Sequence, residues 1–464
     1  MTNQPSSGRL QRAFPIGMGI VLVAGGAILH LVRQRGVPLW NSLWAEDGSV
    51  FLSDAMHDFA GTFFAENGGY VHVVPRIIAG AAAALPVEDA AAGMAAAASV
   101  VVALIAGFVY FASGEVLPSR MARFGLAAAV LLLPVPGSDL LANATNLHFY
   151  LLFGCFWALF WQSETPAALG ARSAVGLAAT LSDPLAALFM PLALVAPLAR
   201  RRVRAFMVSG VFVAGLATQL LVTWGGERPH RNWGFRPADL LDIFSLRVTG
   251  GLLVGDRFLG DAWLAYGRTF SYTAFLLVAA IIALLLTRSS RATVAFVFIA
   301  LGYGCLFFCV QLVGRGTGGT DPDLGVFQLN GARYILLPFL FTTAGILALV
   351  DRNVRLRRGA AWAWTRRVAL VWLAALLIVN YSVTSDRSRG PRWDTELMRA
   401  RDSCATRSAT VVRVLVAPSP PRVWFASVPC SRLGDGVAAT RSGRIAEGRK
   451  RHSRLFSRRP GGLL

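Results

Sequence analysis

Two adjacent carboxylates, Glu46 and Asp47, are the residues best suited to chemistry in this sequence. They lie in the stretch 44–48 (Trp-Ala-Glu-Asp-Gly), which follows the first apolar segment, Phe14 to Val32. A positioned carboxylate can take the proton of an attacking hydroxyl group, and a second carboxylate can orient the first, bind a substrate or hold a divalent cation. Adjacent acids in a loop are more often ordinary solvated charge, so the surrounding elements decide between the two interpretations.

The composition places this pair in a membrane protein. The chain has 464 residues, 55% of them hydrophobic, and a mean hydropathy of +0.54. That is too apolar for a soluble multidomain enzyme, and several runs are long enough to span a bilayer. We therefore expect an all-α polytopic protein of the bacterial plasma membrane, with about eleven transmembrane helices and the lipid bilayer as its surroundings.

The positive charge indicates how the chain crosses the membrane. The net charge is +20, almost every base is arginine, and Lys450 is the single lysine. Such a charge is also typical of nucleic-acid-binding proteins, but many of these arginines fall between apolar spans, where they set topology instead, so we expect no nucleic-acid partner. The basic segments are Arg9 with Arg12, Arg120 with Arg123, Arg172, Arg200 to Arg204, Arg288 with Arg291, and Arg352 to Arg367.

Alternation of these basic segments with acidic or Gly-rich ones predicts a cytoplasmic N-terminus and an extracytoplasmic C-terminus. The loop 33–70, with the acidic pair, then lies outside, although Arg33 and Arg35 alone favour the opposite orientation. The run 70–85 is short for a full crossing and is expected to be a juxtamembrane helix on the outer face. Ser182-Asp183-Pro184 should interrupt a helix inside the membrane, and residues 225–268 should form a long outer loop.

The sequence divides into a transmembrane domain and two C-terminal parts. Residues 1–383 contain the apolar spans and the outer loop with the acidic pair. Residues 384–433 form a small extracytoplasmic appendage with β-prone runs at 410–416 and 422–428, and residues 434–464 are a basic tail expected to be disordered. Among the cysteines, Cys155, Cys305 and Cys309 lie in apolar segments, while Cys404 and Cys430 lie in the appendage.

The order of these parts resembles the GT-C superfamily of integral-membrane glycosyltransferases, and more closely an actinobacterial branch with Trp-x-Glu-Asp-Gly in the first outer loop. The resemblance covers most of residues 14–433. It is carried by the following short motifs: Glu46-Asp47-Gly48, Tyr70 to Arg76, Asn146 to Tyr150, Ser182-Asp183-Pro184, Gly331 to Tyr334, and the pattern of Trp393, Cys404 and Trp424 to Cys430.

The resemblance implies a sugar transferase of the cell envelope that serves cell wall biogenesis. The donor would be a sugar linked to a polyprenyl phosphate, and the sugar would be transferred with inversion to an extracytoplasmic glycan, lipid or protein. The first acidic position of the family corresponds to Glu46 as general base, and Asp47 would orient it, bind the acceptor or hold a divalent cation. Many relatives have Asp at the first position, so the choice of base between Glu46 and Asp47 stays open.

The leaving lipid phosphate needs positive charge at the outer membrane surface, where a guanidinium can bind phosphate oxygens bidentately. Arg76 and Arg333 fall at that level, and Tyr334 follows Arg333 directly. Both arginines could equally be anchors that extend from helix ends to the interface. The candidates for substrate contact are His72, Asn146, His148 and Tyr150. Each of these residues could instead be a structural hydrogen-bonding group.

Other functions of a polytopic membrane protein compete with this one. A transporter or flippase for lipid-linked saccharides would have a similar number of spans, but the sequence shows no internal repeat, and its polar residues gather in outer loops. An O-antigen-type polymerase or ligase is a closer alternative, which the early acidic pair disfavours. A purely structural membrane protein is the remaining alternative.

We predict that Cys404 and Cys430 form a disulfide, because both lie in an oxidising compartment and flank the β-prone runs. Closing a loop of about 25 residues should stabilise the segment by roughly 3 kcal/mol in the chain-entropy description. Mass-spectrometric counting of free thiols under non-reducing conditions should find both sulfurs blocked. Two free thiols would contradict the disulfide.

Overall fold

Helices form most of the described chain, and several of them are long and apolar. The computed structural model describes residues 16–135, 137–200, 203–224, 237–315, 332–356, 360–406, 409–419 and 423–433. Within these ranges, six helices are long and apolar enough to cross a membrane: Val87–Glu115, Val203–Val222, Asp256–Leu286, Arg291–Gly314, Ala332–Asn353 and Trp362–Val379. The chain is an all-α polytopic membrane protein, as predicted. The sequence predicts about eleven crossings. The described chain has these six long helices and four shorter apolar helices of 10–17 residues.

The first half of the chain is helical up to the basic cluster near residue 200. Its elements are α1 (Ile16–Leu31), η1 (Leu39–Asn41), η2 (Asp47–Leu52), α2 (Ser53–Thr62), α3 (Val73–Ala83), η3 (Val87–Asp89), α4 (Ala90–Ala112), η4 (Ser113–Glu115), α5 (Arg120–Leu131), α6 (Gly137–Leu140), α7 (Leu147–Phe160), α8 (Pro166–Thr180), η5 (Pro184–Phe189) and α9 (Met190–Arg200). The elements η2 and, later, η6 are π-helices. The predicted juxtamembrane helix corresponds to α3.

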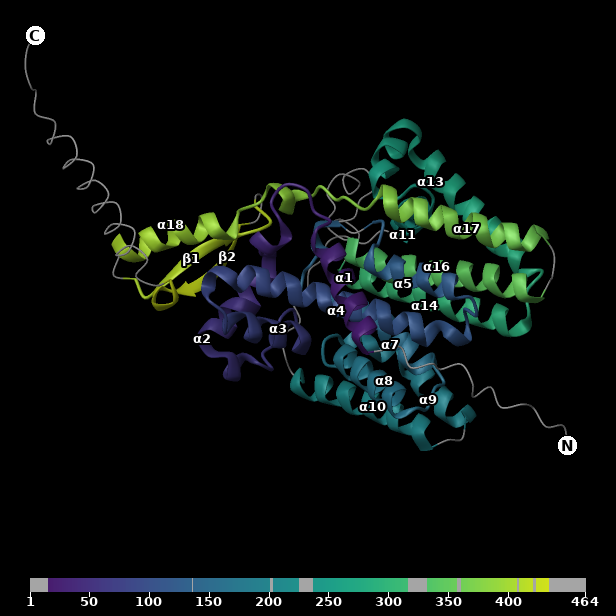
Figure 1. Ribbon diagram of the computed structural model, residues 1–464, viewed down its shortest axis with the longest axis horizontal. Coiled ribbons are helices and arrows are strands. Elements are labelled where there is room, and N and C mark those ends of the chain that lie inside the picture. The colour runs from purple at the N-terminus through teal and green to yellow at the C-terminus, as the bar shows by residue number, and fades with distance from the viewer. Residues whose placement is uncertain are drawn as a thin grey trace, which may run out of the picture.

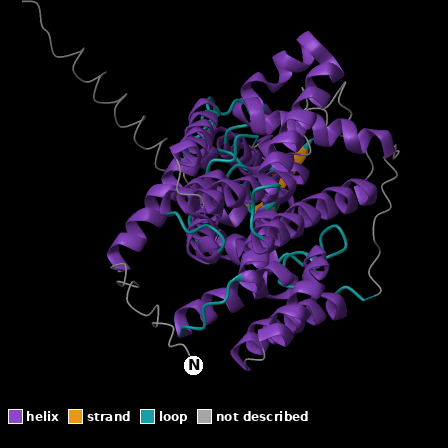
Figure 2. Cartoon of the chain, turned by 90° about the vertical axis from the view of Figure 1, so that its right-hand side faces the viewer, coloured by secondary structure: helices purple, strands orange, loops and turns teal. Residues whose placement is uncertain are grey.

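The second half adds the remaining spans and a small sheet. Its elements are α10 (Val203–Val222), α11 (Pro237–Ile243), η6 (Phe244–Gly250), α12 (Gly251–Val254), α13 (Asp256–Leu286), α14 (Arg291–Arg315), α16 (Ala332–Leu356), α17 (Ala360–Val379), η7 (Asp386–Arg389), α18 (Trp393–Thr406), β1 (Val411–Val416), β2 (Trp424–Pro429) and η8 (Cys430–Arg432). Helices dominate the described chain, and β1 and β2 form the one sheet in it (Figure 2). The Gly-rich loop before α16 and the tail after residue 433 lie outside the described residues.

Helix α16 is the central helix of the membrane body. Of its apolar stretch, 89% is buried, compared with 17% of Trp362–Val379 in α17. It packs against α5, α7, α14 and α17, and α5, α14, α16 and α17 run side by side (Figure 1). Edge-to-face ring pairs fill the centre, such as Phe156 with Phe341, whose ring centroids are 5.0 Å apart. The first turn of α16 is therefore a fixed position at one end of the bundle.

Residues 237–268, the described part of the region expected to be a long outer loop, are largely helical, so the prediction of a loop there was wrong. Helix α13 begins at Asp256 rather than near residue 272, and it bends at Gly267, where φ is +52°. Its first half leaves Phe258, Leu264 and Tyr266 exposed. Mixed polar and apolar residues are typical both of loops and of helices with one exposed face, which is why the sequence did not separate the two.

The predicted interruption at Ser182-Asp183-Pro184 has a simple local cause. Helix α8 ends at Thr180, and the backbone of Asp183 is extended before Pro184. The Leu185 amide donates to Asp183 Oδ1 at 2.8 Å, so the acid caps the short helix η5. Asp183 therefore satisfies a buried helix end.

The C-terminal unit packs against the first outer segment, residues 33–72, which is named for the side of the membrane on which it is expected. Strands β1 and β2 pair antiparallel from Val411 with Pro429 to Val416 with Trp424, and Cys404 and Cys430 are joined by a disulfide. The two strands, α18, α2 and α3 gather at the same end of the molecule (Figure 1). The β-prone runs are thus strands, and α18 is an additional helix of this unit.

Labelling with an impermeant thiol reagent tests the predicted orientation. Arg399 is exposed on α18, and Arg288 is exposed in the turn between α13 and α14. In intact cells, Arg399→Cys should react and Arg288→Cys should react only after the membrane is opened, because the two sites are expected on opposite sides. The wild-type chain, with its own cysteines, gives the background signal. The reverse pattern would invert the topology.

Candidate active site

The acidic pair sits at a sharp turn that opens a helix. Ala45 has a left-handed backbone with φ 35°, and Asp47 is the first residue of η2. A left-handed alanine costs roughly 1–2 kcal/mol, so the surrounding contacts must hold it. The Ala45 amide donates to the Ala417 carbonyl at 2.5 Å, and Trp44 forms a β-bridge with Ala417. The segment after β1 therefore fixes the turn that presents Glu46 and Asp47.

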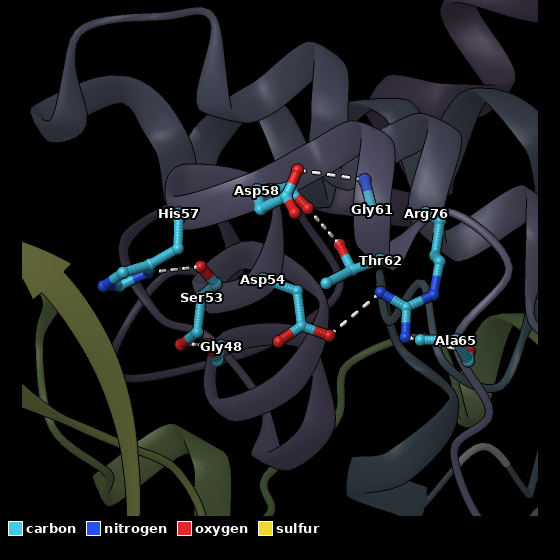
Figure 3. Close-up of polar contacts among 9 residues, drawn as sticks. All are labelled: Gly48, Ser53, Asp54, His57, Asp58, Gly61, Thr62, Ala65 and Arg76. Carbon is cyan, nitrogen blue, oxygen red and sulfur yellow. Dashed lines mark hydrogen bonds and ion pairs between the residues drawn. The ribbon is translucent and has the colours of Figure 1, made fainter.

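The C-terminal sheet also covers the start of η2. A Cβ atom at Gly48 would lie 3.0 Å from Val416 Cγ1, so glycine allows this close approach. Ser53 Oγ donates to the Gly48 carbonyl at 2.7 Å and accepts from the Ser427 amide at 2.8 Å. Figure 3 shows Ser53 beside Gly48 at the beginning of α2. A larger residue at position 48 would thus require the Val416 side chain to shift by a few tenths of an ångström.

Asp47 is a buried hydrogen-bond acceptor. Its Oδ2 accepts from the Ala144 amide at 2.9 Å, and its Oδ1 accepts from the Thr145 amide at 2.8 Å and from Thr145 Oγ1 at 2.6 Å. The side chain is 1% exposed. Ala142, just before these amides, is also left-handed, with φ 45°. Asp47 therefore joins the first outer segment to the segment before α7.

Burial determines the protonation behaviour of this carboxylate. Loss of solvent raises the pKa of Asp47 to about 6, while the hydrogen bonds from Thr145 and Ala144 and the charge of Arg387 act in the opposite direction. The ionised form accepts all three hydrogen bonds. A proton on either oxygen would face an N–H or O–H donor.

The residues around Asp47 do not fit a bound divalent cation. Both of its oxygens are occupied by N–H and O–H donors, whereas a hard cation needs several oxygen ligands directed at it. Within the described ranges, no three His, Cys, Asp or Glu side chains are grouped to hold a metal ion. Asp47 is therefore a hydrogen-bond acceptor and not a metal ligand in this arrangement.

Glu46 has a different environment from its neighbour. It is half-buried and interacts electrostatically with Arg333 on the first turn of α16. Arg333 Nη1 also lies 3.7 Å from Asp139 Oδ2, and its guanidinium lies 5.1 Å from the centre of the Tyr334 ring. Two carboxylates from separate outer segments thus share one guanidinium.

Asp139 is a site residue that the sequence analysis left out. It is 1% exposed, and Asn146 Nδ2 donates to its carbonyl at 2.7 Å. The sequence does indicate a turn with an acid on the predicted outer side, because Asp139 follows Pro136-Gly137-Ser138. A lone acid in a turn can have many structural roles, however, so this pattern alone does not identify a site residue. Asn146 thus helps to hold the Asp139 turn, and its predicted contact with substrate stays a prediction.

A series of ring contacts connects the predicted histidines to Arg333. The ring centroids of Tyr70 and His72 are 4.1 Å apart, those of His72 and His148 5.9 Å, those of His148 and Phe149 4.1 Å, and those of Phe149 and Tyr334 6.2 Å. These residues come from the end of the first outer segment, from α7 and from α16. The structure therefore brings four predicted site residues, His72, His148, Arg333 and Tyr334, into one connected group.

His148 is held by a buried carboxylate. Its Nδ1 lies 2.5 Å from Asp183 Oδ2, and the two residues are 4% and 2% exposed. The other Asp183 oxygen caps η5. Asp183 thus fixes the orientation of the His148 ring, a role that the helix break alone did not indicate.

Arg76 and Tyr150 lie in supporting positions. Arg76 is 3% exposed; its Nη1 lies 2.9 Å from Asp54 Oδ2, and its Nη2 donates to the Ala65 carbonyl at 3.0 Å. Figure 3 shows the guanidinium directed at these two partners. Tyr150 is 2% exposed within the hydrophobic core. The predicted phosphate contact of Arg76 and substrate contact of Tyr150 stay predictions, and the contacts observed are structural.

Comparison with known proteins gives little guidance on function. No protein-family profile matches the chain, and no curated protein matches it. Among solved structures, the chain is similar to the arabinofuranosyltransferase AftD from Mycobacteria, determined by single-particle cryo-EM, with a TM-score of 0.46 and 15% identity. The match covers 90% of this chain and 31% of that chain, so this chain spans about a third of that protein's length. At this TM-score, the likeness carries no argument about activity.

The raised pKa of Asp47 gives a pH dependence of stability with a definite sign. In the folded protein the pKa of Asp47 is about 6, whereas the ordinary pKa of an aspartate, taken for the unfolded chain, is 3.8. Between these two pH values the folded protein binds more protons than the unfolded chain. The contribution of Asp47 to the free energy of unfolding therefore falls as the pH rises from 3.8 to 6 and is constant above pH 6. By linkage, the change is about 3 kcal/mol. The unfolding temperature of wild type minus that of Asp47→Asn, measured in detergent, should therefore decrease from pH 4 to 6.5. A pH-independent difference would contradict this assignment.

Proposed function

We propose that the protein is a membrane glycosyltransferase that moves a sugar from a polyprenyl-phosphate donor to an extracytoplasmic glycan, lipid or protein acceptor, with inversion. The observation that supports this most is the position of Glu46. It directly precedes a buried, fully hydrogen-bonded Asp47 and lies within electrostatic reach of Arg333 at the end of the central helix. A carboxylate and a guanidinium at the end of a bundle suit a reaction between a hydroxyl group and a lipid phosphate.

The proposed chemistry assigns Glu46 as the general base. The acceptor hydroxyl oxygen attacks the anomeric carbon of the donor sugar from the face opposite the phosphate. The new C–O bond forms as the bond to the phosphate oxygen breaks, and the lipid phosphate leaves with the bonding electron pair. Glu46 takes the hydroxyl proton. The three hydrogen bonds of Asp47 favour a supporting role for it, which assigns the base to Glu46 of the two acids.

Arg333 is proposed to bind the leaving phosphate. A guanidinium pairs with phosphate oxygens through parallel N–H donors, and the N-terminus of α16 adds the positive end of a helix dipole. Asp139, 3.7 Å from Nη1, and Tyr334, whose hydroxyl accepts from Nη2 at 3.3 Å, orient the guanidinium. The charge that develops on the phosphate during transfer would therefore meet a fixed cation.

The group of His72 and His148 is proposed to line the acceptor side of the site. Asp183 holds His148, and ring contacts connect both histidines to Tyr334. This arrangement also weighs against a transporter. The grouped polar residues lie on the first turns of α16 and α7, just before α3 and at the junction of α8 and η5. Transporters instead bind their substrates near the middle of the membrane. The GT-C resemblance, a cytoplasmic N-terminus and an extracytoplasmic C-terminus belong to the same proposal.

Replacing the base tests the proposal. Glu46→Gln keeps the shape of the side chain but cannot accept the proton, so consumption of a polyprenyl-phosphate sugar by purified protein in nanodiscs should fall by about 10²- to 10⁴-fold. The apparent unfolding temperature should stay close to that of wild type, because no protein group is hydrogen-bonded to Glu46 in the described contacts.

Glu66→Gln is the matched control. Glu66 lies in the same outer segment and is also only partly buried. Its replacement should leave turnover unchanged within about twofold, since general-base catalysis is lost only at the reacting carboxylate. Full turnover in Glu46→Gln would remove the proposed base, and equal losses in both variants would point to general damage of the segment.

A further inference from the structure

Arg387 is a buried arginine in η7, after the last membrane span. It is 1% exposed, and four of its contacts go to two distant parts of the chain. Nε donates to Ser42 Oγ at 2.8 Å, and Nη2 donates to the carbonyls of Ser42 at 2.7 Å and of Leu39 at 3.2 Å. Nη1 donates to the Leu141 carbonyl at 2.7 Å. One guanidinium thus holds two segments together. The first is 39–42, just before the acidic pair, and the second contains Leu141, just before the residues 144 and 145 that donate to Asp47.

These contacts lie just upstream of the two strained turns. Ser42 is three residues before Ala45, and Leu141 directly precedes Ala142, and both alanines have left-handed backbones. After the turns, the two segments meet again where Asp47 accepts from residues 144 and 145. Arg387 and Asp47 are therefore the two ends of one closed unit that contains Glu46.

The chemistry of this contact set requires arginine. Three carbonyl oxygens and one hydroxyl oxygen accept from three different nitrogens, which matches the planar five-donor fork of a guanidinium. A lysine ammonium at the same place has three donors on one nitrogen and cannot reach both segments in this geometry. Arg387→Lys therefore keeps the charge and loses the bridge.

The backbone of η7 is anchored independently of the Arg387 side chain. Ser385 and Ser388 form a capping box, and the Val37 amide donates to the Ser388 carbonyl at 2.9 Å. The Arg35 amide donates to the Val383 carbonyl at 2.9 Å. Substitution of Arg387 should hence loosen the two outer segments without detaching the C-terminal part of the chain.

Arg387 also faces the charge of Asp47. Burial lowers the pKa of Arg387 to about 10, and the Asp47 carboxylate opposes that change, while Arg387 in turn lowers the pKa of Asp47. The neighbouring charged groups are Glu46, beside Asp47, and Asp386 and Arg389, which are exposed on the same turn as Arg387. Removing the charge of Arg387 should thus shift the ionisation of Asp47 to higher pH.

We propose that Arg387 is a positioning residue that sets the place of Glu46 by bridging the two outer segments. The part of the chain after the last span then belongs to the active site, although it contributes no reacting group. The effect of Arg387 on catalysis rests on the proposed function. The bridge between the two segments does not, because it rests on the hydrogen bonds of Arg387.

The kinetic test compares Arg387→Lys and Arg387→Met with the exposed control Arg389→Lys, using full-length protein in nanodiscs and a polyprenyl-phosphate sugar that wild type consumes. Misplacing the base should lower kcat by about 10²-fold in both Arg387 variants, with the donor KM changed by less than about threefold. In Arg387→Met, the acid limb of the pH–rate profile should also move to higher pH. Arg389→Lys should behave like wild type.

Hydrogen–deuterium exchange tests the bridge without any substrate. In Arg387→Lys, the backbone amides of residues 39–48 and 141–145 should exchange together, faster by about tenfold or more, while β1 and β2 keep their protection. Unchanged exchange in both segments would overturn the inference, as would a wild-type kcat. If wild type consumes no donor, the proposed function fails, and the exchange result still decides whether Arg387 holds the two segments.

Discussion

Burial of the Asp47 carboxylate is the constraint on which the end of the molecule that carries Glu46 and Arg333 depends. A buried charge must be satisfied by hydrogen bonds, and the three donors to Asp47 come from a segment 97–98 residues away. Ala45 and Ala142 adopt left-handed backbones where the two segments turn toward each other. Arg387 donates hydrogen bonds to both segments just before these turns. The strain of the turns is thus offset by hydrogen bonds to Asp47 and from Arg387, while Glu46 interacts with Arg333 and makes no hydrogen bond in the described contacts.

The membrane body supplies a fixed frame for this unit. Because 89% of the apolar stretch of α16 is buried, its first turn cannot move far without disturbing the aromatic core around Phe341. Arg333 on that turn is thereby held beside Glu46 and Asp139. The polar end of the bundle and the apolar core are coupled through one helix, so polar groups carried by loops can keep a defined geometry.

Much of the fold could be predicted from the sequence, because apolar runs, the Ser182-Asp183-Pro184 break and the β-prone runs are local signals. The number of crossings could not, since several apolar helices are too short to be assigned by length. The acidic pair was found because its two members are adjacent. Asp139 and Arg387 were missed because their roles depend on partners far away in sequence, such as Ser42, 345 residues before Arg387. No local pattern carries such contacts.

The central claim is that the chain transfers a sugar from a lipid phosphate. The most direct measurement is an assay of purified protein in nanodiscs with a panel of radiolabelled polyprenyl-phosphate sugars, scoring consumption of each donor and release of free polyprenyl phosphate. The account predicts that at least one donor is consumed, with release of one polyprenyl phosphate for each sugar transferred. Stable donors across the panel, in the presence of cell-envelope acceptors, would contradict it.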